Sequence, residues 1–430
     1  MASSSSPTVQ HVTIDDVITT VVMARVTDFF GFFVYAIASA LVFPTVFFPH
    51  LDPVTGTLWS FALFSLAFLA RPIASLASRW IQRKIGRPAK ITLALMVLGV
   101  STVAIGLLPG YGEIGLLAPI SLGILRFVQG LGLGGAWDGI TLQLKSAAPK
   151  GKEGIYSMVP QLGGPIGFSV AAALFYVLTG FLTEEEFLSY GWRFAFFAVL
   201  AVNVVALFAR LRLMTTNFGS DDDTQLKSAP LKGLLRDEGR TIVLSALLPL
   251  ASYALFHMVT VFPLSYTLLL GSGDVTHILM LELIGGTVAI GAVILSGVLA
   301  DRFSNRVVLW ISCALVPVLC VGIIWLNTHP AIYILLGFVL LGLSYGQSSS
   351  IVPNRFAPEY RYSGSALATN LSWILGAAFA PLVGLFAAWK FGLWASALYL
   401  LSAAVVTSAA LVFLRKEGIA ADRREDVKGE

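Results

Sequence analysis

Twelve long apolar stretches, separated by short polar connections, follow one another along the 430-residue chain. Each has about 20 residues or more, so each can cross the roughly 30 Å hydrocarbon core of a membrane as a helix. The two-residue alternation of a barrel strand is absent, and open strands would leave backbone amides without partners in lipid. The predicted spans are residues 17–48, 57–80, 89–109, 114–144, 155–181, 192–213, 241–270, 275–300, 307–326, 331–352, 364–389 and 392–414.

One polar connection, residues 214–240, is longer than the others and divides the spans into six and six. We therefore predict an all-α membrane protein of two six-helix bundles joined by this linker. The predicted parts are an N-terminal tail (1–16), a first bundle (17–213), the linker (214–240), a second bundle (241–414) and a C-terminal tail (415–430).

The composition agrees with a membrane protein. Hydrophobic residues make up 57% of the chain and charged residues 12%, whereas soluble domains carry about 25% charged residues. The mean hydropathy of +0.82 excludes a soluble enzyme with an added anchor. Cys313 and Cys320 lie seven residues apart in one apolar stretch, too far for a disulfide within a helix and too few for a thiolate metal site.

Charge on the connections predicts the orientation. Connections on one side hold Asp52, Glu113, Glu184, Glu185, Glu186 and Asp274. Those on the other side hold Arg79, Arg83, Lys84, Arg87, Lys90, Lys145, Lys150, Lys152, Arg302, Arg306, Arg355, Arg361, Arg415, Lys416, Arg423 and Arg424. Because Lys and Arg accumulate on the cytoplasmic side of membrane proteins, both termini are expected in the cytoplasm.

Two observations point to a transporter built from a repeat. A basic segment at 83–87 follows the second span, and a related segment at 301–306 follows the eighth. Two halves related by a parallel repeat are typical of alternating-access transporters. No phosphate-binding loop or metal-ligand cluster is present, and the glycine-rich segment at 130–135 lies inside a span, so we expect a gradient-driven process without a cofactor.

Family-like motifs occur in order along nearly the whole chain. They are FFPHLDP at 47–53, FLARP at 68–72, GLLPGY at 106–111, LRFVQG at 125–130, GGAW at 134–137, PQLGGP at 160–165, GWR at 191–193 and RYSG at 361–364. With these motifs the chain resembles the major facilitator superfamily and, within it, the metabolite:proton symporter family. The resemblance implies symport of a small organic acid or osmolyte with protons, in a bacterial inner membrane, by a monomer.

The chain departs from that family at several acidic positions. The second acid expected on the first helix is replaced by Gly31, and the loop acid after the second span by Arg83. A glutamate expected on the fourth helix is Ala136, and a later acid is Ser146. An aspartate, Asp138, appears two positions after Ala136. These losses keep an uncoupled facilitator or exchanger open as an alternative.

Charged residues at membrane depth are functional candidates, because an unpaired charge in lipid costs several kcal/mol. Arg25 and Asp28 are three residues apart on the first helix and can pair, either for function or as a structural ion pair, and Tyr35 continues their face. Arg126 is far from both ends of its span. Its planar fork suits a carboxylate, although it could instead bind only main-chain carbonyls.

The proton-coupling candidates are Asp28, Asp138 and Glu282, of which Asp138 could also be an ordinary acid at a helix end and Glu282 could lie near the outer surface. The expected gating residues, given by the resemblance and the repeat, are Arg83, Arg87, Asp301, Arg302 and Arg306. His257 is either a packing residue or a switch. The full set of expected substrate-binding residues is Arg25, Tyr35, Arg126, Gln129, Tyr253, His257, Gln347 and Trp373.

The predicted function is secondary active transport of a small carboxylate by alternating access, with proton symport. The expected partners are the substrate, protons and the lipid bilayer. Nucleic acid is not an expected partner, because the basic residues report topology. A metal and an enzymatic activity are not expected either. The alternatives are a betaine- or proline-type zwitterion symporter and the uncoupled carrier. A sensor on a transporter fold would need a soluble output domain, for which the predicted tails leave little room.

Overall fold

The computed structural model describes residues 14–136, 144, 148–215, 229–271 and 274–428, and within them it is helical without strands. Eleven of the described helices are long and apolar enough to cross a membrane, or twelve if the pair Glu184–Gly191 and Arg193–Val205, bent by 45°, is one span. The predicted multi-pass all-α architecture is therefore confirmed.

The first half of the described chain contains the helices up to α11. They are α1 (Ile14–Leu41), α2 (Phe43–Phe47), α3 (Pro53–Ile85), α4 (Arg87–Gly106), α5 (Tyr111–Ile114), α6 (Leu117–Gly135), α8 (Glu153–Met158), η1 (Val159–Leu162), α9 (Gly163–Phe181), α10 (Glu184–Glu186), η2 (Phe187–Gly191) and α11 (Arg193–Thr215).

The second half contains the remaining helices. They are α12 (Leu231–Leu247), α13 (Leu250–Leu269), α14 (Val275–Phe303), α15 (Asn305–Gly322), η4 (Ile323–Trp325), α16 (Pro330–Ser348), η5 (Pro353–Arg355), α17 (Arg361–Trp373), η6 (Ile374–Ala378), α18 (Ala380–Phe391) and α19 (Leu393–Lys428). Helix α12 begins inside the segment predicted as the linker, and α19 extends through most of the segment predicted as the C-terminal tail.

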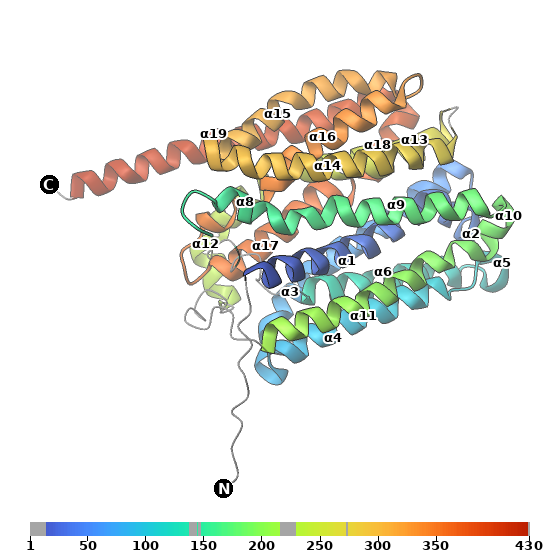
Figure 1. Ribbon diagram of the computed structural model, residues 1–430, viewed down its shortest axis with the longest axis horizontal. Coiled ribbons are helices and arrows are strands. Elements are labelled where there is room, and N and C mark those ends of the chain that lie inside the picture. Colours follow the sequence, from blue (N-terminus) through green and yellow to red (C-terminus); the bar gives the residue numbers. More distant parts are fainter. Residues whose placement is uncertain (1–13, 137–143, 145–147, 216–228, 272–273, 429–430) are drawn as a thin grey trace, which may run out of the picture.

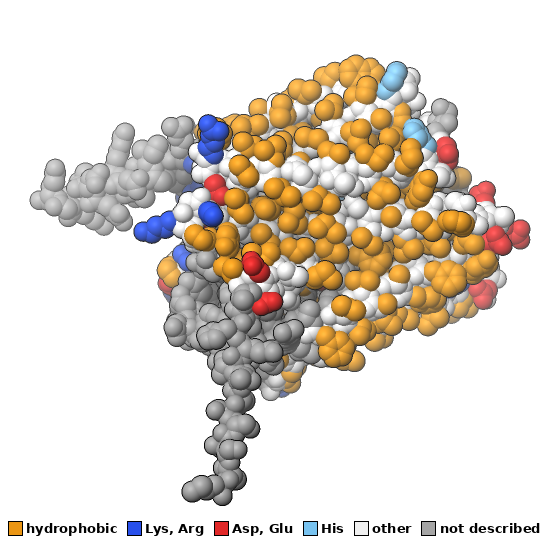
Figure 2. All heavy atoms as spheres, viewed as in Figure 1, with side chains coloured by type: hydrophobic (Ala, Val, Ile, Leu, Met, Phe, Trp, Pro, Cys, Tyr) orange, Lys and Arg blue, Asp and Glu red, His pale blue; other side chains and the backbone are white. Residues whose placement is uncertain are grey.

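The helices run side by side, with α13 to α16, α18 and α19 on one side of the view and α1, α3, α4, α6 and α11 on the other (Figure 1). Helix α17 lies apart from the other second-half helices in this view and packs against α12 and α3. Helices α8 and α9 pack along α14, so these elements form the seam between the two bundles. On the face in Figure 2, a wide hydrophobic band separates an end with Lys and Arg from an end where the charged side chains are Asp and Glu. We call these the basic end and the acidic end.

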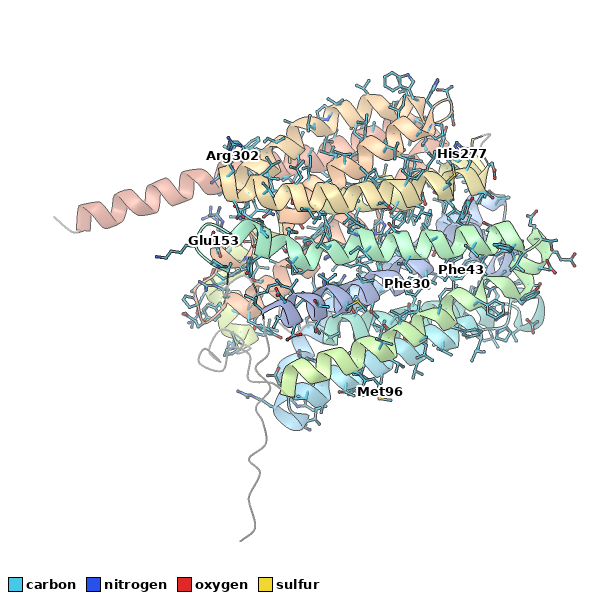
Figure 3. The ribbon with its side chains drawn as sticks, viewed as in Figure 1. Phe30, Phe43, Met96, Glu153, His277 and Arg302 are labelled. Carbon is cyan, nitrogen blue, oxygen red and sulfur yellow. The ribbon has the colours of Figure 1, made fainter. Side chains whose placement is uncertain are left out.

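The two ends are also marked by individual residues. Glu153 of α8 and Arg302 of α14 lie at the basic end, and His277 lies at the acidic end (Figure 3). At the acidic end Asp52 caps α3, because its carboxylate accepts a hydrogen bond from the Thr55 amide at 3.1 Å. Hydrogen bonds from Thr55 hold the pKa of Asp52 below its ordinary value.

Glycines let α6 approach α3 closely. A Cβ added at Gly130 would lie 2.3 Å from the Ala67 carbonyl oxygen, and one at Gly134 would lie 2.3 Å from that of Arg71. The glycine-rich segment of the fourth span is therefore a close helix contact. Because the backbones nearly touch, the side chain of Arg126, one turn before Gly130, reaches the main chain of α3.

Candidate functional site

Arg126 is the centre of a polar network inside the first bundle, where its side chain is 1% exposed. Its Nε donates to the Phe64 carbonyl at 3.2 Å, and its Nη1 donates to Gln129 Oε1 at 3.0 Å. Gln129 Nε2 in turn donates to the Thr102 hydroxyl at 2.7 Å. The guanidinium carbon lies 3.9 Å from the Tyr35 ring centroid. Arg126 Nη2 has no hydrogen-bond partner among the described residues, so this nitrogen can donate a hydrogen bond to an anion.

Arg25 and Asp28 form an ion pair on α1, with Arg25 Nη1 3.7 Å from Asp28 Oδ2. The pairing predicted from their three-residue spacing is thus observed. The Arg25 guanidinium also lies 5.2 Å from the Phe29 ring centroid. A carboxylate and a guanidinium therefore stand together beside the aromatic rings that fill the centre of the protein.

Arg71 brings a third guanidinium to the same region. It lies in α3 just before Pro72, and its guanidinium carbon is 5.6 Å from the ring of Trp373 in α17. This contact crosses from the first bundle to the second. Arg71 was not predicted among the site residues, because no local spacing in the sequence links it to Trp373.

Aromatic rings from both bundles meet between these charged groups, in what we call the central cluster. The cluster consists of Phe29, Phe32, Phe33, Phe64 and Phe68 from the first bundle and of Tyr253, Phe256, His257, Tyr345 and Trp373 from the second. Tyr253 and Trp373 stack with centroids 4.2 Å apart, and Phe33 and Phe256 stack at 5.3 Å. The six phenylalanines were not predicted, because phenylalanine in membrane helices is usually a packing residue.

His257 is enclosed by this cluster and has no exposed surface. Its ring centroid lies 5.2 Å from that of Phe64 and 5.4 Å from that of Phe32. Neither ring nitrogen has a hydrogen-bond partner among the described residues. His257 thus brings two polar atoms to the interface of the bundles.

The basic end of the seam is closed by polar contacts that join the two bundles. Asp301 at the end of α14 accepts hydrogen bonds from the Gly154 amide at 2.5 Å and the Ile155 amide at 3.3 Å. Gln347 Nε2 donates to the Gly154 carbonyl at 3.2 Å. Gln347, expected in the substrate site, therefore lies in this junction and not in the central cluster.

The remaining predicted residues are placed as follows. Arg306 donates to the Leu411 carbonyl, Arg302 is exposed beside the Phe303 ring, and Glu282 is fully buried in α14. Arg83 is exposed and lines a cavity of about 260 Å³ between α3, α12 and α17.

Asp138 and the side chain of Arg87 lie outside the described residues. Lys90, predicted as a charge on a connection, is buried, and its ammonium donates to the Ser78 hydroxyl at 2.9 Å.

The profile of the family described as Major Facilitator Superfamily matches residues 29–381 of the chain. The chain belongs to the Major Facilitator Superfamily. The superfamily indicated by the sequence motifs is therefore confirmed. This membership and the apolar helices make it a multi-pass membrane transporter and not an enzyme.

The relatives in this superfamily carry transporter names. The chain is similar to the inner membrane metabolite transport protein YhjE of Escherichia coli, with 37% identity and coverage of 90% of each chain. It is 29% identical to the shikimate transporter of E. coli, covering 91% of this chain and 92% of that one. It is also 29% identical to the proline/betaine transporter of E. coli, covering 90% and 81% respectively.

Among solved structures, the superfamily fold recurs in a D-xylose-proton symporter. The TM-score is 0.68 with 15% identity, and the match covers 92% of this chain and 97% of the other. At this identity the likeness supports the fold alone.

Proposed function

We propose that the protein is a secondary active transporter that moves a small organic acid together with protons by alternating access, and that its basic end faces the cytoplasm. The observation that carries the anion selectivity is the charge around the central cluster. Among the described residues there, Arg25, Arg71 and Arg126 supply three guanidinium groups, and Asp28 supplies one carboxylate. The free Nη2 of Arg126 offers a directed donor for a carboxylate oxygen.

The ring faces favour an acid over a zwitterion with a quaternary ammonium group. Aromatic faces attract such cations, but the rings of Phe29, Tyr35 and Trp373 already have guanidinium groups 5.2, 3.9 and 5.6 Å from their centroids. A substrate ammonium would have to displace these groups and overcome their repulsion. A carboxylate with an apolar carbon skeleton fits the site, because the guanidinium groups can bind its charge and the aromatic rings can pack against its skeleton.

Proton coupling is assigned to Asp28 in this proposal, with Asp138 and Glu282 as further carriers. Asp28 contacts Arg25 on the same helix, so a rearrangement that brings another partner to the Arg25 guanidinium would change how readily the carboxylate binds a proton.

The uncoupled carrier remains the second candidate because of the packing at Gly31. A Cβ added there would lie 2.9 Å from Val199 Cγ1, so α11 occupies the space that the missing family acid would need. A carrier without that acid could exchange substrates without moving protons.

Purified protein in liposomes tests the proposal. Thermal shift with small carboxylates, glycine betaine and proline should show stabilisation by a carboxylate, followed by uptake of that carboxylate against its gradient when the outside is acidified. Stabilisation by betaine or proline alone would transfer the assignment to zwitterions. Substrate equilibration without accumulation under the proton gradient would favour the uncoupled carrier.

A further inference from the structure

Glu282 is a buried carboxylate that lies outside the central cluster. Its side chain has no exposed surface, and neither of its oxygens has a hydrogen-bond partner among the described residues. It lies in α14, seven residues after Val275 at the acidic end. Such a group normally has an ion partner or a function, because an ionised carboxylate without a partner is costly in an apolar interior.

The neighbouring residues place Glu282 over the seam between the bundles. One turn further along α14, a Cβ added at Gly286 would lie 2.3 Å from Ser169 Oγ of α9, which belongs to the first bundle. A Cβ added at Gly285 would lie 2.2 Å from the Phe338 ring of α16. A residue three and four positions before these glycines is on the same side of the helix, so Glu282 faces the region where α9 and α16 converge on α14.

The helices around Glu282 offer it no charge partner. In their acidic-end halves, the titratable side chains on α14 and on the helices packed against it are Tyr176, His257, Tyr266, His277, Cys320 and Tyr333. His277 is exposed, and the Tyr333 hydroxyl donates to the Met258 carbonyl at 2.8 Å. None of these six is an Asp, Glu, Lys or Arg, so the closed seam accommodates the neutral acid better than the carboxylate.

We propose that Glu282 is a proton-binding site that controls the acidic end of the seam: the seam closes when Glu282 is protonated and opens when Glu282 is ionised and hydrated. This inference rests on the proposed alternating-access function and assigns it a regulatory proton. In a transport cycle, proton binding from the acidic side would then be a condition for closing that side.

The test measures the width of the seam without substrate or gradient. In protein whose Cys313 and Cys320 are replaced by Ala, spin labels are attached at Phe181→Cys in α9 and His277→Cys in α14, two exposed acidic-end positions. Distances between the labels are measured in lipid nanodiscs from pH 5 to pH 9. One coupled proton changes the ratio of long to short distances by up to about tenfold per pH unit.

We expect the long distance to increase with pH in this parent protein and the short distance to persist at every pH in Glu282→Gln. Glu282→Leu should behave like Glu282→Gln, which guards against a specific effect of the amide. Glu185→Gln, which removes an exposed acid at the same end, should keep the pH response of the parent.

A pH response that survives in both Glu282 variants would overturn the proposal, and so would a parent protein without any response. Because no transport is measured, the result is independent of the proposed symport. If wild-type protein fails to accumulate substrate under a proton gradient while the distances respond as expected, symport is wrong and the role of Glu282 stands.

Discussion

The Asp301 carboxylate of the second bundle accepts a hydrogen bond from the Gly154 amide of the first bundle at 2.5 Å. Gly154 is the second residue of α8, so the acid also faces the positive end of the helix formed by α8, η1 and α9. Glycine is required at position 154, because a Cβ there would lie 2.7 Å from Asp301 Oδ1 and from the Gly297 carbonyl oxygen. The contact joins the bundles at the basic end.

Replacing Asp301 by Asn should weaken this closed junction. The variant keeps an acceptor but loses the charge, and hydrogen bonds to charged groups contribute about 1.5–3 kcal/mol. We expect a fall in transport of about tenfold, with a smaller effect for Arg83→Gln because Arg83 is exposed. Uptake rates in liposomes check this. Equal and negligible effects of the two changes would mean that apolar packing alone closes the junction.

Arg126→Lys should reduce substrate affinity by about tenfold or more. Lysine keeps the charge, but its donors are all on one nitrogen, whereas the planar fork of Arg126 reaches Phe64 and Gln129 through two different nitrogens and leaves a third for a ligand. Binding constants from calorimetry check this. Arg193→Lys is the matched control, since Arg193 Nη1 donates to the main-chain carbonyls of Gly106 and Leu108 at 2.8 and 2.9 Å. Unchanged affinity in Arg126→Lys would make Arg126 a structural residue.

Asp28→Asn should abolish accumulation driven by a proton gradient while part of the substrate counterflow remains. The reason is that exchange of substrate needs no release of a proton, whereas uphill uptake does. Paired measurements of uptake and counterflow in liposomes separate the two activities. Asp15→Asn, an exposed acid at the start of the same helix, should leave both unchanged. Accumulation that persists in Asp28→Asn would remove Asp28 from proton coupling.

The orientation can be checked with single cysteines. An impermeant maleimide added to whole cells should label Asp52→Cys at the acidic end and not Lys150→Cys at the basic end, because the positive-inside rule predicts a cytoplasmic basic end. Both positions are exposed in the structure, so accessibility within the protein is not limiting. Labelling of Lys150→Cys alone would reverse the orientation.

Much of the fold could be predicted from the sequence because the lipid allows few solutions. Apolar stretches of 20 or more residues have to be helices, and the glycines of α6 mark a close helix contact in the sequence itself. Arg25 and Asp28 could be paired because a helix fixes their spacing.

The candidate site was harder to predict because its contacts join distant helices. The approach of Arg71 to Trp373, and of Gln347 to Gly154, depends on how two bundles dock, which no local periodicity encodes. The burial of Lys90 beside Ser78 was missed for a related reason. Its sequence position next to other basic residues marks it as a loop charge, although the structure folds it back against α3.

The rings of the central cluster have a consequence for the membrane's electrical insulation. The cavity bounded by Phe33, Phe168, Phe256 and Tyr345 has a volume of about 10 Å³, which is at the lower limit for a single water molecule. A file of water through this region would conduct protons and dissipate the membrane potential. With the rings in contact, this part of the seam is a barrier of low permittivity, so a cell could hold many copies of the protein without spending energy to replace leaked protons.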